Sequence, residues 1–282
     1  MTKGTDHEME RESLMRTSIT QHPAFFLTLR RLTYLRDLLR ELVVRDMKVK
    51  YKRSALGMAW SLLNPLLQLG VFYFLFQVVM ALNVPRFSAY MLSGLLVWTW
   101  FQTSIMQAAT TITGNRDMIR LPGFPCAVLP AVAVTNNMIH FVIASPVLAL
   151  FLFLSGGGVG ASLAALPAVM AVQYLYTLGL AYLAAALNVV FRDTQHLLEL
   201  FLRLYMFMNP IFYTVGHVPP EYQALYRLNP MVPLLESYRA VLMHGAQPDW
   251  SGLAGVVVLG AILLALGVRV FHRLSIRFVD EV

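Results

Sequence analysis

The chain has 282 residues, of which 57% are hydrophobic and 13% are charged, and its mean hydropathy is +0.61. These values exclude an ordinary soluble domain and are typical of a protein with several membrane-spanning helices. The net charge of +7 does not predict nucleic-acid binding. The positive residues adjoin apolar stretches and lack the aromatic and glycine patterns of RNA-binding modules, so anionic lipid headgroups are the better match.

The first part of the chain is polar, and its character changes near residue 22. Residues 1–21 are mixed in charge, which predicts a disordered tail. They contain no apolar core followed by a small-residue cleavage site, so we expect no secretory signal peptide and a cytoplasmic amino terminus. Residues 22–56 predict an amphipathic helix on the inner membrane surface followed by a basic linker, although a helix packed on a soluble partner fits the same pattern. The leucines on its apolar side are Leu29, Leu32, Leu35, Leu39 and Leu42.

The basic run from Arg45 to Arg53 is followed by no charged residue until Arg86. We expect an all-α membrane domain over residues 57–271, because six stretches are apolar and long enough to cross a bilayer. They are residues 57–80, 90–113, 128–154, 163–190, 197–213 and 253–270.

Six crossings place the two termini on the same side, with residues 272–282 as a second tail. Of the 22 Lys and Arg residues, only Arg86, Arg227 and Arg239 then lie outside, while Arg203 lies within a span. Because cytoplasmic loops carry an excess of Lys and Arg, we expect both termini in the cytoplasm.

The links between the predicted spans differ in kind. Residues 83–88 and 155–162 predict short outer turns, and the glycine cluster in the second lacks the Lys-Ser/Thr of a phosphate-binding loop. Residues 114–125 predict a short cytoplasmic helix or turn that ends at Pro122 and could meet a cytosolic partner. Residues 214–252 contain apolar stretches too short to span, so we expect two short re-entrant helices in the outer leaflet. An ordinary outer loop is the alternative.

Polar and aromatic residues recur inside the spans. Hydroxyl and amide groups often hold membrane helices together. They also suit a channel for a hydroxyl-rich polymer, in which aromatic faces contact sugar rings and few charges trap the cargo. Glu199 and Arg203 share a helical face and can pair, either along a pore or at the membrane interface. The candidate lining residues are Trp60, Asn64, Gln68, Phe72, Gln102, Arg203, Met206 and Tyr213.

Sites for nucleotides, metals and catalysis are not indicated. The single Cys126 excludes an intramolecular disulfide and a cysteine-built metal site. The Walker pattern and the His-Glu-x-x-His pattern do not occur in the sequence. We therefore expect no metal, no cofactor in this chain and no enzymatic activity of its own.

Several motifs resemble one protein family. Residues 45–46 and 50–66, which read RD and KYKRSALGMAWSLLNPL, resemble the opening of the permease subunits of type-2 ABC exporters for bacterial cell-surface polysaccharides. These exporters serve O-antigen, teichoic acid and capsule export. Residues 115–120, 191–193, 209–213 and 228–230 extend the resemblance over nearly the whole chain, apart from the first twenty residues.

The resemblance implies a homodimer of six-span subunits in the bacterial inner membrane, bound to two ATPase subunits that carry ATP and Mg. It implies a channel at the dimer interface for a lipid-linked polysaccharide, and it leaves export partners in the periplasm or outer membrane open. The residues expected to contact the ATPase are Arg36, Arg40, Asn115, Arg116, Asp117, Met118, Ile119 and Arg120. The outer helices would close the exit through Leu228, Asn229, Pro230 and Tyr238.

Two rival interpretations are a type-2 exporter permease for a small molecule or lipid, and a membrane-embedded glycan-processing enzyme. The second needs a positioned acid and base, whereas the carboxylates of this chain are dispersed and form no paired-acid motif.

Overall fold

The computed structural model describes residues 24–52, 59–81, 84–121, 123–155 and 160–281. The predicted tail over residues 1–21, the end of the basic linker and the glycine cluster at 156–159 lie outside these residues. The described residues form helices and no strands. The chain divides into two units, residues 1–42 and residues 43–282. Helix α2 (Ala24–Tyr51) begins in the first unit and ends in the second.

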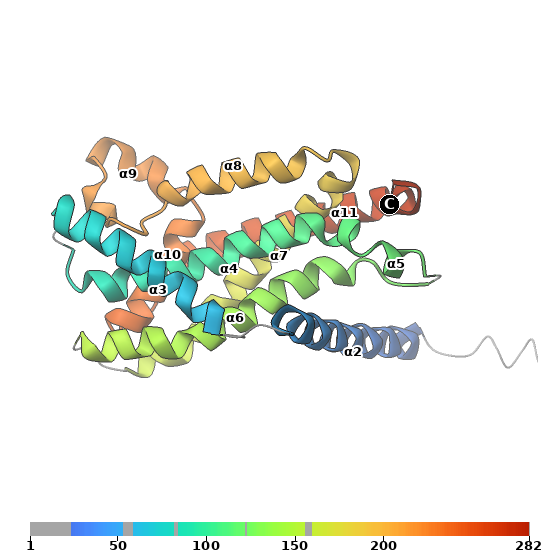
Figure 1. Ribbon diagram of the computed structural model, residues 1–282, viewed down its shortest axis with the longest axis horizontal. Coiled ribbons are helices and arrows are strands. Elements are labelled where there is room, and N and C mark those ends of the chain that lie inside the picture. Colours follow the sequence, from blue (N-terminus) through green and yellow to red (C-terminus); the bar gives the residue numbers. More distant parts are fainter. Residues whose placement is uncertain (1–23, 53–58, 82–83, 122, 156–159, 282) are drawn as a thin grey trace, which may run out of the picture. The chain divides into compact units, whose positions relative to one another are not determined.

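The second unit is a bundle of helices that run alternately between two ends (Figure 1). Helix α5 lies at one end, and helices α9 and α10 lie at the other. The remaining elements in chain order are α3 (Trp60–Tyr73), the π-helix η2 (Phe74–Val79), α4 (Phe87–Gly114), α5 (Arg116–Ile119), α6 (Val128–Leu154), η3 (Ala161–Ala165), α7 (Leu166–Val190), α8 (Thr194–Phe207), η4 (Val215–His217), α9 (Pro220–Arg227), α10 (Met231–Met243) and α11 (Trp250–Glu281).

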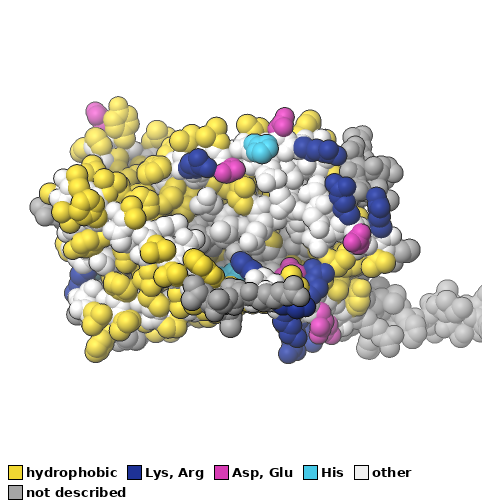
Figure 2. Space-filling model, viewed as in Figure 1, with side chains coloured by type: hydrophobic (Ala, Val, Ile, Leu, Met, Phe, Trp, Pro, Cys, Tyr) yellow, Lys and Arg dark blue, Asp and Glu magenta, His cyan; other side chains and the backbone are white. Residues whose placement is uncertain are grey.

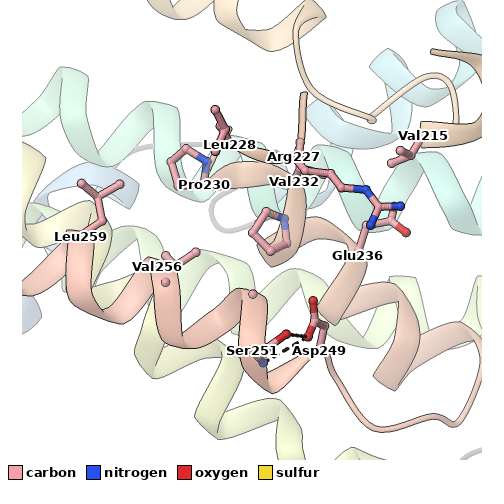
Figure 3. Close-up of a pocket in the computed structure, with 13 residues that line it drawn as sticks. Val215, Arg227, Leu228, Pro230, Val232, Glu236, Asp249, Ser251, Val256 and Leu259 are labelled. Carbon is pink, nitrogen blue, oxygen red and sulfur yellow. Dashed lines mark hydrogen bonds between the residues drawn. The ribbon is translucent and has the colours of Figure 1, made fainter. Parts of the chain in front are cut away.

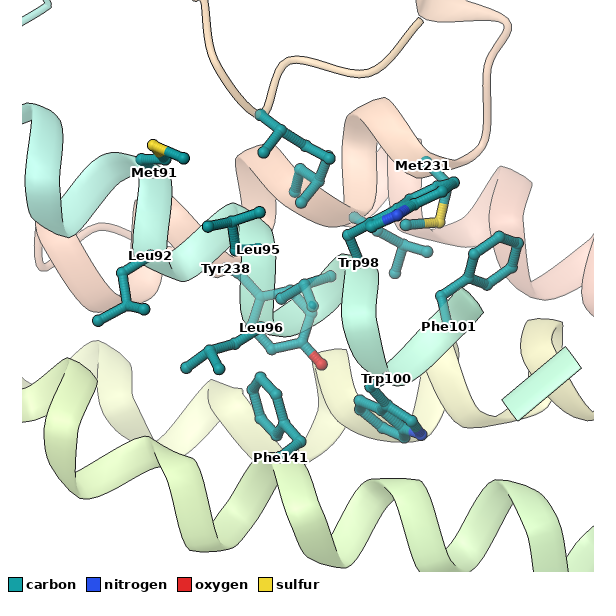
Figure 4. Close-up of a cluster of buried hydrophobic side chains, with 14 of the residues drawn as sticks. Met91, Leu92, Leu95, Leu96, Trp98, Trp100, Phe101, Phe141, Met231 and Tyr238 are labelled. Carbon is teal, nitrogen blue, oxygen red and sulfur yellow. The ribbon is translucent and has the colours of Figure 1, made fainter. Parts of the chain in front are cut away.

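Helix α4 is the centre of the packing, since α3, α6, α7, α8 and α10 all contact it. Its side chains Trp98, Trp100 and Phe101 are almost completely buried. Figure 4 shows them beside Phe141 of α6 and Tyr238 of α10. Because lipid tails are as apolar as these side chains, close packing rather than escape from water stabilises such a core.

Helices α7 and α11 approach so closely that glycine is required between them. A Cβ atom on Gly179 would lie 2.7 Å from the backbone nitrogen of Leu264, and one on Gly267 would lie 2.8 Å from the carbonyl oxygen of Gly179. Small residues at such crossings allow backbone-to-backbone contact, a common way for helices to associate in membranes.

Four helical stretches among the described residues are long and apolar enough to cross a membrane, judged by length and composition. They are Leu62–Val79, Val128–Leu154, Ala161–Val190 and Trp250–Ser275. They correspond to the first, third, fourth and sixth of the predicted spans. Helix α4 covers the second predicted span but contains many Ser, Thr, Gln and Gly residues, which lower its hydropathy.

The fifth predicted span differs from the structure. Residues 197–213 do not form one helix, because α8 ends at Phe207. Pro210 explains the difference, since proline donates no backbone hydrogen bond and disfavours helical geometry at the preceding Asn209. The 14 residues of α8 span roughly 21 Å at 1.5 Å per residue, less than the thickness of the hydrocarbon core.

The α7–α11 crossing yields a stability prediction. Gly179→Ala should lower the free energy of unfolding in detergent by about 1–3 kcal/mol, because the new Cβ atom overlaps backbone that cannot move aside. Gly70→Ala is the matched control, since a Cβ atom there has no neighbour within 4 Å. Thermal unfolding of both variants measures the difference, and equal midpoints would contradict the proposed crowding.

Candidate functional site

A polar cavity of about 240 Å³ lies near the end of α2, between α3, α4 and α6. It brings together the predicted lining residues Trp60 and Asn64 with polar side chains of α4 and α6. The polar members from those two helices are Thr99, Thr103, Gln107, Asn137 and His140. A further hollow of about 230 Å³ also borders Gln107 and His140. The chain thus contains a hydrophilic recess within an otherwise apolar bundle.

The last turn of α2 contributes a hydrogen-bonded cluster to this cavity. Lys50 Nζ lies 3.1 Å from His140 Nε2, and Tyr51 Oη lies 3.0 Å from His140 Nδ1. Because a charged ammonium group can only donate, Nε2 accepts from Lys50 and the proton on Nδ1 points to Tyr51. Burial lowers the pKa of Lys50. Lys50 and Tyr51 belong to the motif that resembles the exporter family, but the motif did not indicate that these residues line a cavity.

Amide and hydroxyl groups on α4 and α6 form a chain along the cavity wall. Thr103 Oγ1 donates to Asn137 Oδ1 at 3.0 Å, and Asn137 Nδ2 donates to Gln107 Oε1 at 2.9 Å. The sequence analysis did not select Gln107. The four-residue steps of Thr99, Thr103 and Gln107 along one helical face were the available signal.

Other predicted lining residues lie elsewhere. Phe72 of α3 packs against Phe212, with ring centroids 4.7 Å apart, and Phe76 stacks on the same ring at 4.9 Å. Tyr213 Oη donates to the carbonyl oxygen of Phe207 at 2.9 Å. These rings form an aromatic cluster towards the end of the bundle that carries α9. The sequence analysis did not select Phe212 as a lining residue, because a residue that follows a helix-breaking proline belongs to no helical periodicity.

The remaining candidates have local partners. Gln102 accepts a 2.7 Å hydrogen bond from the indole nitrogen of Trp98, one turn earlier on α4. Met206 packs, partly buried, against the core, and Gln68 is half-buried on α3. These three residues do not line the 240 Å³ cavity.

Helix α8 presents a predicted ion pair within an exposed apolar face. Arg203 Nη2 lies 2.9 Å from Glu199 Oε1, and both side chains are more than half exposed. Large hydrophobic side chains around them are also exposed, namely Leu197, Leu200, Phe201, Leu204 and Phe207. Exposed side chains also include Leu67 and Val71 of α3 and Phe74, Val78 and Val79 of η2. Such extended apolar surfaces mark contact with lipid or with another subunit.

A buried arginine joins the elements at the end of the bundle that carries α9 and α10. The guanidinium carbon of Arg239 lies 3.5 Å from the ring centroid of Tyr90, and Nη1 donates to Tyr90 Oη at 2.8 Å. Tyr90 Oη in turn donates to the carbonyl oxygen of Tyr213 at 2.8 Å. Glu236 accepts a second bond from Arg239 at 3.2 Å. This network joins α10, α4 and the turn after α8, and the sequence analysis had treated Arg239 only as an outer positive charge.

The predicted exit residues have different environments. Asn229 Oδ1 accepts from the backbone nitrogen of Met231 at 3.0 Å and from Tyr205 Oη, while Nδ2 donates to Asn209 Oδ1 at 3.0 Å. It therefore connects α8 to the start of α10. Leu228 is 77% exposed and Pro230 is half-buried, whereas Tyr238 is fully buried. Tyr238 can therefore affect a gate only through packing.

The opposite end of the bundle carries the short helix α5. Ile119 is buried, and Met118 Sδ accepts a 2.9 Å bond from Arg45 Nη1 of α2. Asn115 Nδ2 donates to the carbonyl oxygen of Thr111 at 2.8 Å. The other predicted contact residues, Arg116, Asp117 and Arg120, are exposed. Figure 2 shows Lys and Arg side chains gathered at the end that carries α5 and the start of α8.

The first unit contains the two other predicted ATPase contacts. Arg36 and Arg40 are both exposed on α2, and Arg36 pairs with the adjacent Asp37 at 3.0 Å.

A helical bundle with several apolar spans, an embedded polar recess and a short charged helix at one end is typical of a transport protein. The family model for ABC-2 type transporters matches residues 37–243. The chain belongs to this family of membrane transporters.

Its relatives are similar over most of their length. The chain is 35% identical to the O-antigen export system permease protein RfbA of Myxococcus xanthus over 255 residues, which cover 90% of this chain and 98% of that protein. It is 31% identical to an O-antigen export system permease protein RfbA of Klebsiella pneumoniae over 250 residues, which cover 88% of this chain and 96% of that protein. It is 21% identical to the polysialic acid transport protein KpsM of Escherichia coli over 236 residues, which cover 82% of this chain and 91% of that protein.

The arginine network predicts a loss of stability in Tyr90→Phe. This substitution removes the hydroxyl group that accepts from Arg239 and donates to Tyr213. Arg239 Nη1 and the carbonyl oxygen of Tyr213 then each lose a hydrogen bond. We expect the free energy of unfolding to fall by about 1–3 kcal/mol. Tyr222→Phe, at an exposed position of α9, is the control. Thermal unfolding in detergent compares the two, and no greater loss in Tyr90→Phe would contradict a structural role for the network.

Proposed function

We propose that this chain is the membrane-spanning subunit of an ATP-driven exporter that moves a lipid-linked polysaccharide out of the cytoplasm across the bacterial inner membrane. The observation that carries the proposal is the similarity over nearly the full length of relatives named for O-antigen export, extended by a polysialic acid transport protein. A permease for a small molecule or lipid is the alternative, and the names of these relatives do not favour it.

In the proposed topology, α3, α4, α6, α7 and α11 cross the membrane, and α8 makes the sixth crossing together with the turn at residues 208–213. Both termini then lie in the cytoplasm. The distribution of Lys and Arg along the sequence supports this orientation. The end that carries α5 then faces the cytoplasm, and the end that carries α9 and α10 faces outward. Two short helices, α9 and α10, would dip into the outer leaflet. Helix α10 is packed in the protein core, whereas no residue of α9 is buried.

The proposed active form is a homodimer with a channel at the interface. The exposed apolar faces of α3 and α8 support this form, because a second copy could cover part of each. The recess around Asn64 and the aromatic cluster around Phe212 would then belong to one path for the polymer. Weak hydrogen-bonding groups and ring faces suit the hydroxyl and C–H surfaces of sugars.

The energy would come from two separate ATPase subunits that bind ATP and Mg. Helix α5 supports this coupling role, since Ile119 and Met118 anchor it while its charged residues remain exposed. Arg36 and Arg40 on α2 offer further charged contacts. Closure of the ATPase subunits would move α5 and so bias the channel between closed and open states.

Export in cells tests the function and the coupling together. A strain without this chain should accumulate the glycan inside, and the wild-type chain should restore it to the surface. The triple variant Arg116→Ala, Asp117→Ala, Arg120→Ala should insert normally but reduce surface glycan at least about tenfold, as expected if α5 transmits the ATP-driven change. Surface labelling and membrane fractionation measure both quantities.

Arg273→Ala is the control for this experiment, since Arg273 is exposed near the same end of the bundle on α11. Normal export in the triple variant would remove α5 from the mechanism. Normal surface glycan in the strain without the chain would contradict the proposed function itself.

Water access tests the channel. In a Cys126→Ser background, a cysteine at Gln68 should react with a membrane-impermeant thiol reagent during ATP turnover, because that face of α3 would line the path. A cysteine at Val258 of α11, which is 60% exposed on a surface that contacts hydrocarbon in the proposed topology, should remain protected by lipid. Labelling is read by a mass shift, and equal protection at both positions would argue against a wet lining.

A further inference from the structure

A cavity of about 640 Å³ lies between α10, the link before it and the first turns of α11. Its apolar wall is formed by Val256 and Leu259 of α11 together with Leu228 and Pro230 of the link. Figure 3 shows these side chains around the open space. The volume falls within the range of protein sites for small ligands.

Charged side chains gather at one end of this cavity, away from Leu259 (Figure 3). They are Arg227, Glu236 and Asp249. Arg227 forms no ion pair with either carboxylate among the residues that the structure describes. Asp249 Oδ1 accepts from the backbone nitrogen of Ser251 at 3.1 Å, and hydrogen bonds from Ser251 lower the pKa of its carboxyl group. The cavity therefore has an apolar part and an end with both signs of charge.

The cavity is open at Gly255. A Cβ atom built on this residue would have no neighbour within 4 Å, so a side chain there would project into free space. Val258 and Ile262, which follow on the same helix, are 60% and 58% exposed. Because α11 is long and apolar enough to cross a membrane, this surface contacts hydrocarbon in the proposed topology. An acyl chain can therefore enter the cavity from the bilayer.

We propose that this cavity binds a phospholipid whose headgroup carries a phosphate and a free ammonium group, as in phosphatidylethanolamine. The acyl chain lies along Val256 and Leu259, the phosphate meets Arg227, and the ammonium group donates to Asp249. The inference rests on the proposed function only for the membrane topology, which assigns the site to the outer leaflet.

The charge pattern favours this lipid over others. Arg239 already pairs with Glu236, so Arg227 and Asp249 are the charges left for a headgroup. A purely anionic headgroup would match Arg227 but would offer no cationic group to Asp249. A quaternary ammonium headgroup has no N–H group to donate to Asp249. A neutral sugar has hydroxyl groups for the charged end of the cavity but no acyl chain for its apolar wall.

Lipid retention by the purified full-length chain tests the proposal. The chain in detergent is incubated with equal amounts of phosphatidylethanolamine, phosphatidylcholine and phosphatidylglycerol, and bound lipid is measured by native mass spectrometry. We expect phosphatidylethanolamine to be retained about tenfold more than the other two, a difference of about 1.4 kcal/mol. Because no transport is measured, the result does not depend on whether the chain exports a polysaccharide.

Two substitutions locate the binding. Gly255→Leu should reduce phosphatidylethanolamine retention about tenfold by filling the cavity, and Arg227→Gln should remove the preference for that lipid. Gly70→Leu is the matched control, because a Cβ atom at Gly70 also meets no neighbour within 4 Å, and that residue lies on α3. Unfolding midpoints are measured in parallel so that misfolding is recognised.

Equal retention of the three lipids would overturn the headgroup assignment. Unchanged retention in a folded Gly255→Leu variant would overturn the site. Binding of an oligosaccharide that Gly255→Leu abolishes, with no effect on lipid, would make the cavity a glycan site and would also overturn the proposal.

Discussion

The end of the bundle that carries α9 and α10 depends on one buried charge. Arg239 is 2% exposed, and a guanidinium group taken out of water must find partners within the protein. Its partners come from α4 through Tyr90 and from α10 through Glu236. Gly94 makes the position possible, because a Cβ atom there would lie 3.0 Å from Arg239 Nη2. Since α4 is the helix on which the others pack, this contact fixes α10 against the centre of the bundle.

The same rule applies to neutral polar groups in the rest of the bundle. Gln173 of α7 donates to the carbonyl oxygen of Val97 at 3.0 Å, and Asn137 connects α6 to Gln107 of α4. These bonds use polar side chains to join helices, as expected in lipid. Around Asn64, by contrast, several polar side chains border a cavity. A transport path through the membrane would need such surplus polar groups, which cost stability but can exchange partners with a passing hydroxyl group.

Helix bounds and local pairs were accessible from the sequence, because both depend on neighbours along the chain. The stretch 128–154 coincides with α6, and Glu199 and Arg203 pair as their four-residue spacing predicts. The sequence analysis extended the fifth span to residue 213 because these residues are apolar, and it gave too little weight to the helix-breaking effect of Pro210. Features assembled from distant segments, such as the Arg239 network and the 640 Å³ cavity, could not be inferred, because periodicity carries no information on which helices become neighbours.

The glycine contact between α7 and α11 divides the molecule into parts of unequal freedom. Backbones that touch at Gly179 and Gly267 cannot slide past each other without steric overlap, and separating them would lose their close packing, so this pair is suited to act as a stationary frame. Helices α3 and α8 bury far less of their surface and end in irregular geometry, a π-helix in one and a proline turn in the other. Any cycle that admits and releases a bulky cargo must therefore draw its displacement from these two helices while the frame holds the subunit in the bilayer.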